Sequence, residues 1–139
     1  MSNTFKSECR VSIVTVTYNS LSILPELLNS LPERVPCIVV DNASDNHAAL
    51  SELVVAYGAR LIRNDNNCGF GVACNIGAAQ AQTEFLLFLN PDARLERDTL
   101  KELVSCADVS RLRGHAERRL VATWQEEGAL PHECPGRVL

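Results

Sequence analysis

Residues 85–89 form an uninterrupted apolar run, Phe-Leu-Leu-Phe-Leu, which ends abruptly in Asn90-Pro91-Asp92. A run of this length predicts a strand that is buried on both faces, as strands of parallel sheets are. Pro91 has no backbone N–H to donate to a sheet ladder, so the strand is expected to end before it. Asp92 is therefore predicted to lie just beyond the carboxyl end of a buried strand.

Three other segments have the patterns of strands. Residues 11–18 are rich in β-branched side chains, and residues 37–41 form a second apolar run that ends in the carboxylate of Asp41. Residues 60–63 alternate between polar and apolar side chains, which predicts a short strand nearer the edge of the sheet.

Apolar residues at helical spacing follow each strand. The first stripe is Leu24, Leu27, Leu28 and Leu31. We expect Ser22 to cap this helix, and Gly58 to end the next one, whose stripe begins at Leu50. A third helix is expected over residues 71–81 and a fourth from about Glu96. The evidence for the third is the helical spacing of Val72, Ile76 and Ala79.

The alternation of strand and helix predicts an α/β fold with a mostly parallel central sheet and helices on both faces. The first strand ends in polar residues at positions 17–19, the second in Asp41 and the fourth in Asp92. Open α/β sheets bind ligands outside the carboxyl ends of their strands. A carboxylate there is a candidate ligand of a hard divalent cation that carries phosphate oxygens. A ligand site is thus predicted at this edge.

The loop of residues 64–71 leads into the third helix and contains Gly69 and Gly71. Glycine allows a positive φ or a close backbone approach, and a helix N-terminus after such a loop offers unpaired N–H groups to a phosphate. Many loops between a strand and a helix carry glycine for turn geometry alone, so the pattern indicates a phosphate site only together with the other strand ends.

Composition and charge narrow the class of protein. The chain has 139 residues, 46% hydrophobic and 22% charged, as expected for one soluble domain with its own core. A net charge of −4 gives no electrostatic reason to expect a nucleic acid partner. No segment has the apolar length of a transmembrane helix, and residues 1–10 lack the apolar core of a signal peptide. We expect a cytoplasmic protein and leave open a peripheral association with the inner face of the membrane.

The cysteines and histidines have simple interpretations. The six cysteines form no C-x-x-C pair, so reduced thiols, several of them in the core, are expected rather than a zinc site. The three histidines, His47, His115 and His132, are interpreted as solvated or packing residues rather than catalytic bases.

The pattern changes after residue 108. Residues 109–139 are rich in arginine and show no further strand pattern. The spacing of four residues predicts a helix there: Leu112, Ala116, Leu120 and Trp124. We therefore divide the chain into a domain over residues 1–108 and an atypical tail over residues 109–139, as in a truncated or frame-shifted reading frame.

Four segments, residues 14–20, 39–45, 66–77 and 89–93, occur in an order and spacing that closely resemble the donor-binding half of family 2 glycosyltransferases. The Asn-Pro-Asp form resembles the rhamnosyltransferase-like branch of that family. The resemblance covers about residues 9–108, and it implies the Rossmann-like nucleotide-binding part of a GT-A fold. It also implies a nucleotide-sugar donor, dTDP- or UDP-linked, a divalent metal (Mg²⁺ or Mn²⁺), and sugar transfer to an acceptor in cell-surface polysaccharide synthesis.

The resemblance also implies roles for individual residues. By position, the residues that would line the nucleoside pocket are Thr17, Tyr18 and Asn19, with Asp41 bonding the base or lying beside it. Those that would approach the ribose and the diphosphate are Asn67, Gly69, Gly71 and Asn75. Asn90 and Asp92 stand where the family has its D-x-D motif, so Asp92 would be the metal ligand and Asn90 would assist it.

Each of these roles has a structural alternative. Asp41 and Asp92 could cap the turns that follow their strands. Tyr18 could lie at the edge of the core, and the two glycines could serve turn geometry alone. Another Rossmann-like binding module is disfavoured because no G-x-G-x-x-G follows the first strand.

The functional alternative is a nucleotide-binding remnant without catalysis. Family members continue for another stretch of chain that supplies the acceptor region and usually an Asp or Glu general base. None of the glutamates after residue 108 has a context that matches that base, and the catalytic residue is unassigned. An unpaired sheet edge in a shortened chain predicts aggregation or a homodimer.

Overall fold

The computed structural model describes residues 10–112 and 119–124. Within these residues, five parallel strands form one sheet in the order β3-β2-β1-β4-β5. The strands are β1 (Val11–Thr17), β2 (Cys37–Asp41), β3 (Arg60–Arg63), β4 (Phe85–Leu89) and β5 (Arg119–Trp124). The predicted α/β class is confirmed, and the alternating segment 60–63 lies at an edge of the sheet as expected.

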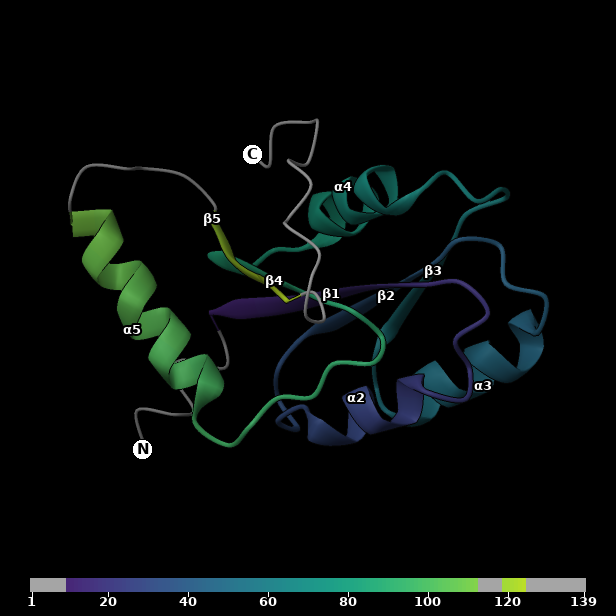
Figure 1. Ribbon diagram of the computed structural model, residues 1–139, viewed down its shortest axis with the longest axis horizontal. Coiled ribbons are helices and arrows are strands. Elements are labelled where there is room, and N and C mark those ends of the chain that lie inside the picture. The colour runs from purple at the N-terminus through teal and green to yellow at the C-terminus, as the bar shows by residue number, and fades with distance from the viewer. Residues whose placement is uncertain (1–9, 113–118, 125–139) are drawn as a thin grey trace.

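Helices cover both faces of the sheet (Figure 1). They are α2 (Leu24–Ser30), α3 (His47–Ala56), α4 (Phe70–Gln80) and α5 (Thr99–Leu112). Buried residues of α2, α3 and α5 pack in one apolar cluster with one face of the sheet, and those of α4 pack in a second cluster with the other face. The α5 helix begins at Thr99 rather than at Glu96.

The two clusters explain why β2 and β4 read as apolar runs and why β1 is buried along its whole length. Successive side chains of a strand point to opposite faces, and in β1 Ile13 belongs to the cluster under α2 and α3, whereas Val14 belongs to the cluster under α4. All five residues of β4 are buried for the same reason. Hydrophobic burial on both faces thus fixes β1, β2 and β4 as the centre of the sheet.

The packing face of α4 consists mainly of small residues. Of the three residues at helical spacing, Ile76 packs against the second cluster, whereas Val72 and Ala79 are exposed, and the buried residues of the helix are Ala73, Cys74 and Gly77. A Cβ atom at Gly77 would lie 2.5 Å from Val14 Cγ1. Small residues therefore let α4 approach the sheet closely, a feature that a pattern of large apolar residues does not reveal.

The helix ends follow the sequence in one case and depart from it in another. The α3 helix ends with Gly58 at φ = 70°, and the Ala59 N–H donates to the Val54 carbonyl at 3.1 Å, as in a Schellman motif. The prediction that Ser22 caps α2 is wrong, because no side chain caps it and the Leu24 N–H donates to the Ser20 carbonyl at 3.0 Å.

The helix predicted from the spacing of residues 112–124 is wrong over residues 119–124. These residues form β5, whose backbone pairs in parallel with β4, Phe85 opposite Arg119 and Leu89 opposite Trp124. The free edge of β4 offers a row of backbone partners, and such pairing overrides a weak helical spacing. The α5 helix also continues past residue 108 to Leu112. The other residues of the predicted tail lie outside the described part of the chain.

Four cysteines among the described residues form no disulfide: Cys37, Cys68, Cys74 and Cys106. Cys37 and Cys74 are buried, as predicted for small core residues, and desolvation raises the pKa of the Cys37 thiol to about 12. Cys9 and Cys134 lie outside the described residues. None of the helices that the structure describes is long and apolar enough to cross a membrane.

Candidate functional site

The parallel sheet brings the predicted site residues to one edge. Thr17 at the end of β1 pairs with Asp41 at the end of β2, and Asp41 pairs with Arg63 at the end of β3. Leu89 at the end of β4 pairs with Thr15, so the chain that continues into Asn90 leaves the sheet beside the end of β1. The loops after four strands therefore meet at this carboxyl edge.

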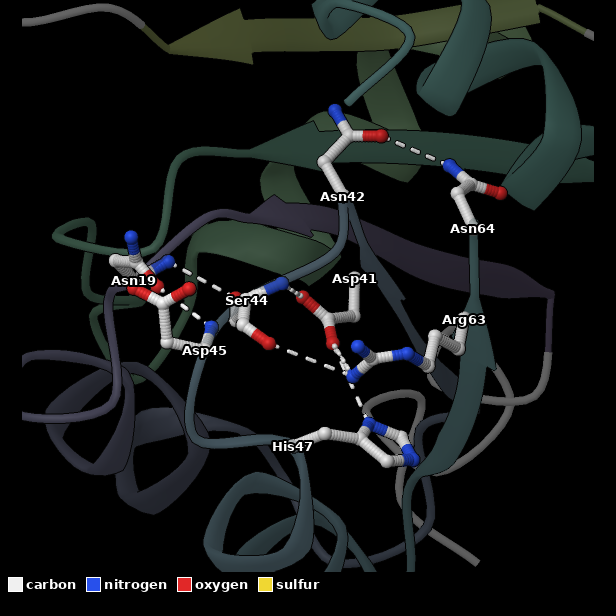
Figure 2. Close-up of polar contacts among 8 residues, drawn as sticks. All are labelled: Asn19, Asp41, Asn42, Ser44, Asp45, His47, Arg63 and Asn64. Carbon is white, nitrogen blue, oxygen red and sulfur yellow. Dashed lines mark hydrogen bonds and ion pairs between the residues drawn. The ribbon is translucent and has the colours of Figure 1, made fainter. Parts of the chain in front are cut away.

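Asp41 is the most buried charged group at this edge, with no exposed side-chain area. Its Oδ1 accepts the backbone N–H of Ser44 at 3.0 Å, and its Oδ2 lies 3.3 Å from Arg63 Nη1 (Figure 2). A buried carboxylate requires such partners because desolvation is costly. The turn-capping alternative for Asp41 is thus present in the structure, and its contact with a base stays a prediction.

His47 faces the same oxygen of this carboxylate as Arg63 (Figure 2). It is the first residue of α3, and its Nδ1 lies 3.5 Å from Asp41 Oδ2. Nδ1 is buried and has no hydrogen-bond partner in the described structure, although 40% of the side chain is exposed. His47 therefore faces the Asp41 carboxylate from the first turn of α3, and its interpretation as a solvated or packing residue rather than a catalytic base stays a prediction.

The first two loops are tied together by Asn19 and Ser44. The Asn19 N–H donates to Ser44 Oγ at 2.9 Å, and Asn19 Oδ1 accepts the Asp45 N–H at 2.9 Å. Asn19 has φ = 51°, a conformation that asparagine tolerates better than most residues. Beside this clamp lies a cavity of about 510 Å³, lined by Asn19, Ser22 and Asn46 among others.

The predicted wall of the nucleoside pocket is only partly exposed. Thr17 is fully buried, and its Oγ1 has no hydrogen-bond partner among the described residues. Tyr18 is 52% exposed, so it does not lie at the edge of the core, and Asn19 is also exposed. Tyr18 and Asn19 therefore offer accessible side chains at this edge, whereas Thr17 does not.

Asn42 connects the loop after β2 to the loop after β3. Its Oδ1 accepts hydrogen bonds from Asn64 Nδ2 at 2.8 Å and from Cys68 Sγ at 3.2 Å. Its Nδ2 donates to the carbonyl of Gly69 at 3.1 Å. The Asn42 side chain is buried, and Figure 2 shows it on the opposite side of the loop from the Asp41 carboxylate.

Gly69 precedes the first residue of α4 and has φ = 82°. A Cβ atom there would meet nothing within 4 Å, so the backbone conformation rather than space requires glycine. The Gly69 N–H donates to Asn67 Oδ1 at 3.0 Å. Gly71 is in the first turn of α4 without a positive φ, and Asn75 is exposed one turn later.

The start of α4 carries free hydrogen-bond donors. The first bond of the helix runs from the Ala73 N–H to the Gly69 carbonyl. The N–H groups of residues 70–72 precede that bond and have no partner among the described residues, as is usual at a helix N-terminus. Such groups, together with the positive end of the helix dipole, can bind an anion.

Asn90 and Asp92 follow β4 as predicted. Asp92 is exposed, and neither of these side chains forms a hydrogen bond or ion pair with a residue that the structure describes. The turn-capping alternative for Asp92 is therefore not observed; the backbone closes this turn through the Ala93 N–H and the Asn90 carbonyl at 3.0 Å.

The oxygen ligands that Asp92 and Asn90 offer fit a metal site in which phosphate supplies further ligands. No group of three His, Cys, Asp or Glu side chains that could hold a metal occurs among the described residues. A carboxylate and an amide oxygen suit Mg²⁺ or Mn²⁺, which bind proteins through one or two carboxylates while phosphates and water complete the shell. The residues therefore fit a cation that arrives with a phosphate ligand.

Sequence reasoning missed three residues that shape this edge, Asn42, Ser44 and Arg63. The first two lie within the segment 39–45 that carries the family resemblance, next to Asp41. Arg63 ends the alternating strand, and only its register opposite Asp41 reveals the ion pair.

The comparisons with known proteins decide the family. The family model described as Glycosyl transferase family 2 matches residues 12–112. The chain belongs to this family. The match spans most of the described structure and includes every predicted site residue from Thr17 to Asp92.

Two curated proteins illustrate the similarity to other family 2 members. The 4,4'-diaponeurosporenoate glycosyltransferase of Staphylococcus haemolyticus is 31% identical over 103 residues, which are 68% of this chain and 27% of that protein. The poly(ribitol-phosphate) β-N-acetylglucosaminyltransferase TarS of Staphylococcus aureus is 30% identical over 110 residues, 71% of this chain and 19% of TarS. The chain thus spans about a quarter or less of these relatives.

Solved structures confirm the GT-A fold. The crystal structure of S. aureus TarS 1–349 matches with a TM-score of 0.63 and 28% identity, covering 73% of this chain and 33% of that one. TarS 1–349 has also been solved in complex with UDP. The mannosyltransferase PcManGT of Pyrobaculum calidifontis, in complex with GDP-Man and Mn²⁺, matches with a TM-score of 0.62 and 25% identity, covering 68% and 31% of the two chains.

Proposed function

We propose that this chain binds the nucleotide diphosphate of a nucleotide-sugar donor at the carboxyl edge of its sheet, as part of a family 2 sugar transfer. The observation that carries the proposal is the meeting of four loops at one edge, with the free N–H groups of α4 beside them. An anionic diphosphate suits a helix N-terminus, and an open α/β sheet binds ligands outside its carboxyl edge.

The proposed contacts follow the positions of the side chains. Tyr18 and Asn19 are exposed beside the loop after β2 and would contact the nucleoside, and Asp41 would bond the base or lie beside it. The segment 67–71 and Asn75 would approach the ribose and the diphosphate. Thr17 is buried, so it would shape the end of β1 rather than contact the nucleoside directly.

Asp92 is the proposed ligand of a divalent cation, with Asn90 assisting. Its exposed carboxylate has no partner among the described residues, which supports this role. A cation held there would neutralise the charge on the donor diphosphate. The protein's own part is to hold one carboxylate and one amide at the end of β4, and to present the N–H groups of α4 to the phosphates.

We also propose the nucleotide that carries the sugar, the process that the transfer serves and the place of the protein in the cell. A UDP- or dTDP-linked donor is supported by the structure of TarS with UDP and by the rhamnosyltransferase-like Asn-Pro-Asp segment. The name of TarS, which acts on poly(ribitol-phosphate), supports a role in cell-surface polysaccharide synthesis. Such a role would place the protein in the cytoplasm, at the inner face of the membrane. A homodimer is proposed because β3 and β5 are terminal strands of the described sheet.

Calorimetry with UDP, dTDP and GDP, each with and without Mn²⁺, tests the proposed function. We expect one of these nucleotides to bind, more tightly with Mn²⁺ than without it. GDP belongs in the series because PcManGT was solved with GDP-Man. Absence of binding by all three nucleotides in both conditions would contradict the proposal.

A second candidate function is nucleotide binding without sugar transfer. It is supported by the proposed contacts at the carboxyl edge, which all go to the nucleotide and its metal. An assay that measures release of the nucleoside diphosphate distinguishes the two candidates. Release shows that a bound nucleotide-sugar is hydrolysed or transferred in a metal-dependent reaction. Turnover that the Asp92→Ala variant loses supports the transferase, and binding without turnover supports the second candidate.

A further inference from the structure

Asn42 is buried, with 3% of its surface exposed, and all of its side-chain hydrogen bonds in the described structure go to the loop of residues 64–69. A buried amide must satisfy its donors and its acceptor, because an unpaired polar group costs free energy. The partners of Asn42 come from the beginning and the end of that loop.

The contact with Gly69 has a particular consequence for α4. The Gly69 carbonyl accepts hydrogen bonds from Asn42 Nδ2 and from the Ala73 N–H that opens the helix. The Gly69 N–H is held by Asn67 Oδ1. Both polar backbone groups of Gly69, which has φ = 82° and ψ = 169°, are thus held by hydrogen bonds, and the direction of the free N–H groups of residues 70–72 depends on this residue.

Cys68 reports on the same network. Its thiol donates to Asn42 Oδ1 at 3.2 Å and accepts from Asn64 Nδ2 at 3.3 Å, yet the residue is exposed. The alkylation rate of a thiol depends on its access and on the fraction present as thiolate. The reactivity of Cys68 therefore measures whether Asn42 holds the loop.

We propose that Asn42 is a positioning residue for donor binding: its side-chain amide fixes the loop 64–69 and thereby aims the N-terminus of α4 at the diphosphate. The inference rests on the proposed function for its ligand, but the anchoring of the loop is a separate claim. Asn42 touches the loop and not the donor. Its removal changes donor affinity through the backbone of Gly69.

Two substitutions separate anchoring from general packing. Asn42→Ala removes all three hydrogen bonds. Asn42→Asp keeps the shape and the acceptor for Asn64 and Cys68, but it replaces the donor to Gly69 with an oxygen that faces a carbonyl. Asn29→Ala is the matched control, because Asn29 Oδ1 accepts one exposed hydrogen bond from Tyr57 on the neighbouring helix.

The experiment measures two quantities in a chain whose Cys9, Cys106 and Cys134 are replaced by serine. One is the affinity for the nucleotide, found by calorimetry with UDP, dTDP and GDP in the presence of Mn²⁺. The other is the rate at which iodoacetamide alkylates Cys68, with and without saturating nucleotide. Circular dichroism establishes that each variant is folded.

We expect both Asn42 variants to bind the nucleotide at least tenfold more weakly than the parent, and Asn29→Ala to bind within twofold of it. Cys68 alkylation should accelerate at least fivefold in Asn42→Ala, because the loop is released. It should slow in Asn42→Asp, because a carboxylate beside the thiol disfavours the thiolate. Positioning is identified if both Asn42 variants lose nucleotide affinity while Cys68 alkylation changes in opposite directions in the two. A general loss of packing would instead accelerate Cys68 alkylation in both variants.

The outcomes distinguish the two proposals. If the parent chain binds no nucleotide, the proposed function fails, and an unchanged alkylation rate in folded Asn42→Ala overturns the anchoring as well. If the parent binds and a folded Asn42 variant binds within twofold, the inference alone is overturned. If both variants unfold, the test is made on the parent chain, in which saturating nucleotide must slow the alkylation of Cys68. An alkylation rate that saturating nucleotide leaves unchanged overturns the inference.

Discussion

Arg10 and Asp108 form a two-point contact that joins the start of β1 to α5, with Arg10 Nη2 2.7 Å from Asp108 Oδ1 and Arg10 Nη1 2.9 Å from Asp108 Oδ2. The same guanidinium donates to Glu84 just before β4, and it lies over the Phe85 ring. The hydrogen bond with Arg10 lowers the pKa of Asp108 below its ordinary value. This pairing fastens the end of the sheet opposite the candidate site.

The lowered pKa of Asp108 gives a pH-dependent contribution to stability. A folded-state pKa below the unfolded value means that the contribution is present above about pH 4, and it is lost as the pH falls through the folded pKa. Because 44% of the Asp108 side chain is exposed, Asp108→Asn should cost only about 0.2–1 kcal/mol at pH 7. Urea unfolding at pH 7 and pH 2.5 measures this difference, which should shrink at the lower pH. Glu52→Gln, at an exposed position of α3, is the control, and an undiminished difference at pH 2.5 contradicts the assignment.

Gly77→Ala should destabilise the fold. The added Cβ would lie 2.5 Å from Val14 Cγ1 and 3.0 Å from Val40 Cγ2, both on stiff β-branched side chains. Overpacking of this kind costs about 1–3 kcal/mol. Thermal unfolding of Gly77→Ala, Val14→Ala and the double variant tests the contact. We expect the double variant to be more stable than the sum of the single losses implies, and strict additivity would show that the two residues do not meet.

Gly69→Ala should lose stability and donor affinity together. Alanine at φ = 82° and ψ = 169° is strained by about 1–3 kcal/mol although the site is open, because this backbone region is essentially restricted to glycine. Gly58→Ala is a matched control, because Gly58 has φ = 70° and open space but lies at the end of α3. Both variants should unfold at reduced temperatures, and only Gly69→Ala should weaken nucleotide binding in calorimetry. If both variants lost nucleotide affinity equally, Gly69 would have no particular role in the nucleotide site.

Asp41→Asn should destabilise the chain by about 1–3 kcal/mol, because it removes the charge that faces Arg63. The value should be smaller than for a fully buried pair, since 38% of the Arg63 side chain is exposed. Urea unfolding measures the loss, and Arg60→Gln, which removes an exposed hydrogen bond to Gln80, is the control. A variant as stable as the parent would mean that the ion pair contributes no net stability.

Asp92→Ala should change function and leave stability nearly unchanged, within about 0.5 kcal/mol, because its exposed side chain has no partner among the described residues. The Mn²⁺-dependent part of nucleotide binding should disappear in calorimetry, whereas Glu102→Gln on α5 should retain it. Retention of the full Mn²⁺ effect in Asp92→Ala would exclude Asp92 as the metal ligand.

Much of the architecture could be predicted from local pattern. Uninterrupted apolar runs identified β2 and β4, because burial on both faces requires apolar side chains at every position. Gly58 marked the end of α3, because a left-handed residue favours glycine. The face of α4 was not predictable in this way, since Gly77 packs on Val14 by having no side chain.

The sequence by itself determined the class of fold, the family and the order of the polar strand ends, because each depends on local patterns and on the order in which they follow one another along the chain. The tertiary structure decided which of those polar groups meet. Arg63 reaches Asp41 only through the register of β3 on β2, and Asn42 reaches Gly69 only because two loops return to the same edge. β5 also required the tertiary structure, because a strand at the edge of a sheet depends on the neighbour with which its backbone pairs.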